Sequence, residues 1–507
     1  MPTESIPTTT VKPRPTRAAA QALLREITDA AAYSSLAARV KYPVGAMLIS
    51  QTVLTFGATA VLARALGPRA FGEYALALTI AGVFQLVAAF PVESGIPKFL
   101  AEARSGEAGP QPARVEQACS ACPPAVWQER SRRESASSPV LAFYSAGIWC
   151  RLGASAFALL WCALGARWLS RAFHAPGLSA PVLIAAVSLC LLTPFSLYFM
   201  ACIQGMERPR HWATGNLLTS ALVFPFLLFG ALGFAGWGQR GLMALIAGGW
   251  LAAALACGLL AGSALGFLRP RSDVGPQVRQ FITFLLPMWV VPLAGFGART
   301  IMKLLVAKSW SSVALGHFEI ALTLLGHMGV IYQACMIVLL PEWARLYARR
   351  EAGRLLDSLA RARGVLVGAA VAYGALLAFG GHWVVPAIFG RDQIGAVPAV
   401  RVIGVVMPIM ISGWVASATN VVSNRTGNIG KANVIWFSVG VPLSIVLIPP
   451  LGALGAALAW LGAYVVFAWY YVSRARPFFH EVEGWAAREQ TQVAASAAPA
   501  GPEKTGA

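Results

Sequence analysis

The chain has 507 residues and a formal net charge of +19, yet only 12% of its residues are charged and 57% are hydrophobic. Soluble domains carry about 25% charged residues, whereas here the apolar residues gather in runs of about 20, the length of a helix that crosses a bilayer. This composition excludes an ordinary water-soluble fold and indicates a helical protein with many membrane spans.

Apolar runs, each bounded by charged residues, Pro or Gly, predict twelve transmembrane helices. In chain order the runs cover residues 43–63, 72–96, 140–164, 181–203, 212–235, 241–266, 280–306, 314–340, 364–388, 395–422, 432–449 and 453–473. An even number of spans places both termini on one side of the membrane.

The spans divide into two halves of six, an N-lobe of residues 43–266 and a C-lobe of residues 280–473. The longest internal polar segment is rich in Pro, Cys and Arg, a composition that indicates disorder. We expect the polar segments at the side of the termini to be a basic arm at 1–42, a loop at 105–138, a linker at 267–279 and a tail at 474–507.

The basic residues are distributed very unevenly between the two sides of these spans. Of the 40 Lys and Arg residues, 28 fall on the side of the termini and seven on the other. Cytoplasmic loops carry such an excess, so we expect a multi-pass protein of the cytoplasmic (inner) membrane with both termini in the cytoplasm. The asymmetry accounts for most of the positive charge without nucleic acid as a partner. The arm before the first span lacks the apolar core of a signal peptide.

Two segments of the chain repeat each other. Residues 72–82 read GEYALALTIAG and residues 316–326 read GHFEIALTLLG, with five of eleven positions identical. The copies open the second and eighth spans, six apart, so the halves keep one orientation and form a parallel repeat. We therefore expect an all-α membrane protein of about twelve transmembrane helices, in two six-helix lobes around a central cavity. This design is typical of transporters that work by alternating access.

Both ends of this helical region resemble a known family. ATAVLARALGPRAFGEYALALTIAGVFQLVAAF (58–90) and KFLAEAR (98–104) resemble the opening hairpin of polysaccharide-biosynthesis or O-antigen flippases, and IPPLGALGAALAWLGAY (448–464) resembles their last hairpin. These flippases belong to the multidrug, oligosaccharidyl-lipid and polysaccharide exporter superfamily. The resemblance implies translocation of an undecaprenyl-diphosphate-linked oligosaccharide for O-antigen, capsule or exopolysaccharide assembly. The 105–138 loop is longer than the linker usual in the family, so its role stays open.

Cations at membrane depth are the candidate substrate-binding residues, because a lipid diphosphate is anionic and charged residues in a span are costly unless they face water or a partner. Arg299 and Lys303 are the leading pair, one turn apart on the seventh span. Pro287 and Pro292 precede them and predict a bend. The alternative is that both reach the outer interface beside Lys308. The other cavity candidates are Arg151, Arg401, Glu93 and Lys98.

Ion coupling has three candidates on the eighth span, Glu319, His317 and His327. Burial commonly shifts the pKa of such groups, so that they can switch between charge states. Coupling to a proton or sodium gradient stays open. No cofactor is expected. The expected partners are membrane lipid and the lipid-linked oligosaccharide, while association with a polysaccharide polymerase or glycosyltransferases stays open.

Other function classes find less support in the sequence. The chain has no phosphate-binding GxxxxGK[ST] loop. Its outer loops are short, whereas a membrane glycosyltransferase would present acidic groups there and a polysaccharide polymerase a large outer loop, so these two functions are less favoured. We expect no enzyme and no catalytic residue. Cys119 and Cys122 lack the further ligands of a metal site. The main alternative is an ion-coupled multidrug or small-molecule antiporter of the same superfamily, yet the first span contains no carboxylate. Residues 342–363 have the pattern of an amphipathic helix on the membrane surface.

Overall fold

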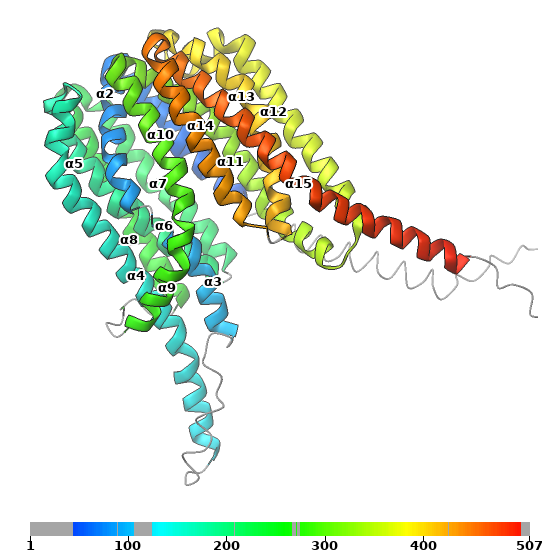
Figure 1. Ribbon diagram of the computed structural model, residues 1–507. Coiled ribbons are helices and arrows are strands. Elements are labelled where there is room, and N and C mark those ends of the chain that lie inside the picture. Colours follow the sequence, from blue (N-terminus) through cyan, green and yellow to red (C-terminus); the bar gives the residue numbers. More distant parts are fainter. Residues whose placement is uncertain are drawn as a thin grey trace, which may run out of the picture.

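The computed structural model describes residues 44–88, 90–105, 124–206, 208–265, 270, 274–423 and 425–497. Within this part the chain is almost wholly helical and contains no strand (Figure 1). The α-helices are α2 (Ala58–Ala88), α3 (Val92–Ser105), α4 (Pro124–Ala172), α5 (Ser179–Val187), α6 (Thr193–Gly205), α7 (Pro209–Leu232), α8 (Phe234–Leu265), α9 (Gly275–Met288), α10 (Val290–Ser309), α11 (Ser312–Ala348), α12 (Ala352–Phe389), α13 (Val397–Val422), α14 (Gly427–Leu451) and α15 (Ala453–Ala497). The shorter helical segments are the π-helices η1 (Thr52–Gly57) and η3 (Ser188–Leu192) and the 3-10 helices η2 (Pro176–Leu178) and η4 (Arg391–Ala396). The expected arm at 1–42 and the cysteines at 119 and 122 lie outside the described residues.

Among the described residues, ten helical stretches are long and apolar enough to cross a membrane. The two longest stretches, Val44–Leu86 with 43 residues and Gly427–Trp485 with 59, each contain a glycine with positive φ in their interior, Gly67 at +71° and Gly452 at +57°. Glycine adopts this conformation without the clash of a Cβ, and each glycine divides its stretch into two helices. The expectation of about twelve helices is therefore confirmed.

Two of the spans are broken at mid-depth. The second span ends its outer part at Ala88 and restarts as α3 at Val92, because Pro91 has no N–H to continue the helix. The seventh span breaks at Trp289, between α9 and α10, within its cluster of prolines and glycines. The rings of Phe90 and Trp289 lie 5.9 Å apart. The two breaks are therefore neighbours.

The break at Trp289 is also where the chain passes from one lobe to the other. α9 packs on α3 and α4, with Phe281 and Leu285 fully buried there, whereas α10 packs along α14. The expected boundary at residue 280 therefore falls inside a helix that packs with the N-lobe. We use N-lobe for α2 to α9 and C-lobe for α10 to α15.

The polar segments contain more helix than their composition indicates. Residues 124–138 of the expected loop are the start of α4, and α15 continues through the expected tail to Ala497. Residues 342–363 form the end of α11 and the start of α12, with a turn between them. Their apolar side chains, including Trp343 and Leu355, are buried against Phe478 of α15. The apolar side chains that the sequence pattern predicts to contact lipid are thus buried by α15.

The two copies of the sequence repeat meet at the boundary between the lobes. α2 packs along α11, and the first glycines of the copies, Gly72 and Gly316, face each other. A Cβ on Gly72 would lie 2.1 Å from the carbonyl oxygen of Ser312, and one on Gly316 would lie 3.2 Å from the Cα of Gly72. Small residues allow such close approach of membrane helices.

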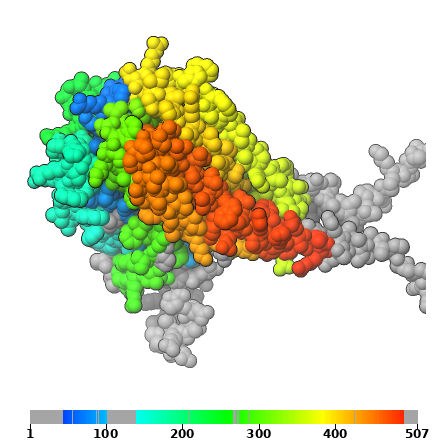
Figure 2. Space-filling view, turned by 45° about the horizontal axis from the view of Figure 1, so that its top comes forward, coloured from blue at the N-terminus to red at the C-terminus, as the bar shows by residue number. Residues whose placement is uncertain are grey.

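The lobes are closed at one end and diverge toward the other. We call the end at which α6 and α13 finish the inner end, following the charge asymmetry, and the opposite end the outer end. In Figure 1 the lobes lie together at the outer end, at the top, and separate below. Figure 2 brings the outer end forward and shows helices of the two lobes in contact there.

Candidate functional site

A cavity of about 1490 Å³ lies between the lobes in the inner half of the bundle. Its N-lobe wall comes from α2, α3, α4, α6 and α9, and its C-lobe wall from α10, α13, α14 and α15. Much of the wall is apolar and includes Met288, Val290, Phe296 and Val434, each of which is between a third and a half exposed. The charged residues that line it are Glu93, Arg151, Lys431 and Arg474.

Arg151 of α4 is the buried cation of the N-lobe wall, with a side chain 1% exposed. Its Nη1 donates to the carbonyl of Ala88 at 2.6 Å, and its Nη2 donates to the carbonyl of Phe90 at 3.1 Å and to the carboxylate of Glu93. The two carbonyls stand at the break in the second span. Arg151 thus satisfies backbone groups that the broken helix leaves free.

Lys431 and Arg474 are the cations of the C-lobe wall, at the start of α14 and within α15. Both are exposed, and neither forms an ion pair with a described residue. The guanidinium of Arg474 lies 5.4 Å from the ring centroid of Tyr470, which also lines the cavity. Both flank predicted spans and are among the 28 basic residues that the charge asymmetry assigns to the side of the termini. Their position one residue outside those spans indicates only the membrane interface, and the packing of the lobes is what places them in the cavity lining.

Arg299, Lys303 and Glu319 form one ion cluster near the outer end of the C-lobe. Arg299 Nη2 lies 3.7 Å from Glu319 Oε1, and the ammonium of Lys303 contacts Oε2. The cluster joins α10 to α11, and its members are not among the residues that line the cavity. Phe296, one turn before Arg299, does line it. The structure thus brings the leading pair of cations together with the main coupling candidate.

The two candidate histidines and Arg401 occupy separate places. His317 packs on η4, where a Cβ on Gly395 would lie 2.4 Å from its Cε1. The ring of His327 lies 5.4 Å from that of Phe56. Arg401 is exposed on α13 and lies outside the cavity lining.

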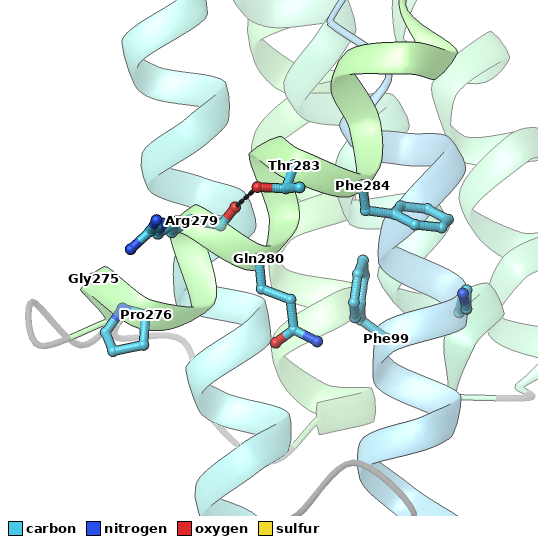
Figure 3. Close-up of a pocket in the computed structure, with 8 residues that line it drawn as sticks. Phe99, Gly275, Pro276, Arg279, Gln280, Thr283 and Phe284 are labelled. Atoms are coloured by element: carbon cyan, nitrogen blue, oxygen red, sulfur yellow. Dashed lines mark hydrogen bonds between the residues drawn. The ribbon is translucent and has the colours of Figure 1, made fainter.

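Lys98 lines a second, more open pocket of about 840 Å³ between α3 and α9 at the inner end. Figure 3 shows Phe99 of α3 facing Phe284 of α9, Gln280 between the two helices, and Arg279 pointing toward the other side of α9. The ammonium of Lys98 lies 4.3 Å from the ring centroid of Phe284. Because Phe284 also lines the central cavity, it separates the two spaces.

Hydrogen bonds close the outer end across the lobe boundary. Gln393 of η4 is buried and donates to the carbonyl of Ala63 at 3.2 Å, and Arg64 donates to the carbonyl of Ala387. The close approach of Gly72 to the backbone of Ser312 is a further contact across this boundary. The cavity is therefore separated from the outer end by packed helices.

Among the described residues, no three His, Cys, Asp or Glu side chains are grouped so that they could hold a metal ion. The cavity therefore offers cations, aromatic rings and apolar surface as its means of binding.

A family model described as "Polysaccharide biosynthesis protein" matches residues 131–398, more than half of the chain. No curated protein matches the chain. Three solved structures are similar to it in fold. One is an inward-facing conformation of a multidrug resistance MATE family transporter of the MOP superfamily, with a TM-score of 0.66 and 12% identity over 87% of this chain and 99% of that chain.

The second is the lipid II flippase MurJ in an inward closed conformation, with a TM-score of 0.58 and 15% identity over 85% of this chain and 86% of that chain. The third is an outward-facing conformation of a multidrug resistance MATE family transporter of the MOP superfamily, with a TM-score of 0.58 and 14% identity over 88% and 96% of the two chains. At these identities the likeness shows the fold, and it confirms the expected all-α, two-lobed membrane architecture.

Proposed function

Since the chain belongs to the polysaccharide biosynthesis protein family, we propose that it translocates an undecaprenyl-diphosphate-linked oligosaccharide across the cytoplasmic membrane by alternating access. The product serves the assembly of O-antigen, capsule or exopolysaccharide. The observation that carries the proposal is the central cavity, whose lining combines Arg151, Lys431 and Arg474 with apolar walls.

The cavity matches the chemistry of such a substrate. Its sugar and diphosphate headgroup needs cations and polar surface, while its polyprenyl tail needs contact with lipid or apolar walls. Lys431 and Arg474, which form no ion pair with a described residue, line the C-lobe side of the cavity, and the paired Arg151 lines its N-lobe side. Charge-assisted hydrogen bonds to phosphate are the strong ones among polar contacts. An anionic headgroup between the lobes would therefore be bound from both walls.

The arrangement of the lobes supports one state of an alternating-access cycle. The outer end is packed shut, and the cavity lies in the inner half. With the inner end and both termini in the cytoplasm, this state would receive substrate from the inner leaflet. The similar MurJ structure is that of a lipid II flippase, which agrees with a lipid-linked substrate here.

An ion-coupled drug antiporter is the competing function. Such a protein would need a free carboxylate in its cavity for a cationic substrate. The carboxylate of Glu93 is already paired with Arg151, and Glu319 is paired with two cations outside the cavity. The charged lining is one acidic residue against three basic ones, which favours an anionic substrate. Glu319, His317 and His327 remain the proposed coupling residues.

Removal of the unpaired cations tests the proposal. We expect the double substitution Lys431→Ala and Arg474→Ala to lower the initial rate of lipid-linked oligosaccharide translocation in inverted membrane vesicles at least about tenfold, because hydrogen bonds to charged groups contribute about 1.5 to 3 kcal/mol each. Arg476→Ala is the matched control, since Arg476 is exposed on the same helix and does not line the cavity. Equal rates for the double variant and the control would refute the proposal.

A further inference from the structure

We propose that Arg151 is an anion-exchange site, in which the carboxylate of Glu93 holds the place that a phosphate group of the substrate takes on binding. This inference rests on the proposed function, because it takes the anion to be the diphosphate of a lipid-linked substrate. It adds that phosphate binding releases the break in the second span, so that substrate arrival acts directly on a hinge.

The exposure of the two side chains requires exchange rather than simple addition. Both residues line the central cavity, but the Arg151 side chain is 1% exposed and that of Glu93 is 33% exposed. A phosphate that approaches from the cavity therefore meets Glu93 first. It can reach the guanidinium only by taking the position of the carboxylate.

The guanidinium also has a donor to spare. Its Nη atoms bond to Ala88, Phe90 and Glu93, whereas its buried Nε has no hydrogen-bond partner among the described residues. Leaving a buried donor unsatisfied is costly. A phosphate has more acceptor oxygens than a carboxylate, and planar guanidinium groups bind phosphate in a two-pronged manner. Replacement of the carboxylate by a phosphate would therefore give more of the N–H donors of Arg151 a hydrogen-bond partner.

The same contacts bridge the break in the second span. Ala88 and Phe90 precede Pro91, and Glu93 lies on α3 beyond it. The N–H of Val92 donates to the carbonyl of Phe90 at 2.7 Å, and the N–H of Ser94 donates to the carbonyl of Pro91 at 3.1 Å. The carbonyl of Ala88 receives neither of these donors, and its hydrogen bond comes from Arg151. When Glu93 leaves Arg151, α3 loses the ion pair through which Arg151 of α4 connects it to the end of α2. Anion binding and hinge movement are then linked through one residue.

The test uses the purified full chain in detergent, with farnesyl diphosphate as the probe. Farnesol and inorganic pyrophosphate are the ligand controls, which separate the isoprenoid from the diphosphate. Binding is measured by calorimetry, and the hinge by hydrogen–deuterium exchange of the amides at residues 92–96. Glu93→Gln removes the competing charge while keeping an acceptor. Glu73→Gln is the matched control at the outer end, where the carboxylate pairs with an exposed arginine.

We expect farnesyl diphosphate to speed amide exchange at 92–96 in the wild type, with pyrophosphate acting at higher concentration and farnesol without effect. Glu93→Gln should bind farnesyl diphosphate about tenfold more tightly than the wild type and show fast exchange before ligand is added. Glu73→Gln should behave as the wild type. Arg151→Gln should abolish the response to ligand, and Arg151→Lys should restore part of it, which a purely structural role would not produce.

Two results would overturn the inference, and they are distinguishable. If farnesyl diphosphate binds the wild type and Glu93→Gln equally and leaves exchange at 92–96 unchanged, the exchange site is refuted while the anionic substrate stands. If farnesyl diphosphate binds neither protein, the proposed substrate class fails, and the inference fails with it.

Discussion

Two groups of oppositely charged side chains pair within the described helices, and they differ between the lobes. Arg151 meets Glu93 beside a break in the backbone and next to the cavity. Lys303 and Arg299 instead share Glu319 between two continuous helices, away from the cavity. Removing one partner of a buried pair leaves a charge without compensation. The first group is therefore placed to exchange its anion, and the second is placed to hold helices together or to change charge as a unit.

At this scale we predict that Glu319→Gln destabilises the protein far more than Glu73→Gln. The first change leaves two cations facing each other at a site where the side chain of Lys303 is 14% exposed, and such a loss costs about 3 kcal/mol. The second removes a surface pair whose arginine is 88% exposed, which contributes less than about 1 kcal/mol. Thermal unfolding of both variants in the same detergent measures the difference. Equal shifts in the midpoint temperature would show that the cluster is solvated.

The sequence could predict the depth of these charges but not their partners. Spacing along one helix puts Arg299 and Lys303 on one face, and this needs no tertiary information. Their ion pair with Glu319 depends on how α10 packs on α11, which no local pattern specifies. Likewise, Lys431 and Arg474 flank predicted spans as ordinary interfacial cations do. Only the arrangement of the lobes turns these two toward a common cavity.

At the scale of elements, the contact of α2 with α11 depends on glycine. The copies of the repeat place Gly72 and Gly316 at equivalent points of the two helices, and there the backbones come within contact distance. The final glycines of the two copies differ: a Cβ on Gly326 would meet no described atom within 4 Å. The first glycine of each copy thus closes the outer end, whereas no such contact constrains Gly326.

We predict that Gly72→Ala opens the outer end. Its Cβ would overlap the backbone of Ser312, which cannot rotate away, so α2 and α11 must separate there. A cysteine at position 323, which is buried beside Thr59 in the wild type, should then react several-fold faster with a membrane-impermeant thiol reagent added from outside. Gly326→Ala is the matched control and should leave the rate unchanged. If the cysteine at position 323 reacts no faster in Gly72→Ala, the contact of α2 with α11 does not control access from the outer end, and the prediction is wrong.

The elements themselves were largely predictable, and their interruptions were predictable in part. Runs of about 20 apolar residues set the positions of the spans, because the bilayer core fixes their length. The prolines of the seventh span predicted its bend, and the structure locates the break at Trp289. What the pattern could not provide is that α9 packs with the N-lobe. That choice follows from the buried contacts of Phe281 and Leu285 with another part of the chain.

At the scale of the whole molecule, the positive charge has two separate uses. Most of the cations fall in the sequence on the side of the termini, where we expect them to fix the orientation of the chain in the membrane. A few lie between the lobes or within them, where they meet carboxylates or face the cavity. The parallel repeat explains why the lobes can close on each other at the outer end, since equivalent helix ends meet across their boundary.

We predict that fixing the outer end closed stops transport without unfolding the protein. Gln393 lies within hydrogen-bond distance of the backbone of Ala63, so cysteines at these two positions, in a background without native cysteines, are within reach of a short cleavable bifunctional thiol reagent. Alternating access requires the two lobes to separate at this point once per cycle. The cross-linked protein should therefore lose nearly all translocation of lipid-linked oligosaccharide and regain it when the linker is cleaved. Each single-cysteine variant, treated with the same reagent, should keep its activity because no bond joins the lobes. Full activity of the cross-linked protein would mean that substrate passes without separation of the outer helices, and alternating access between these lobes would then be wrong.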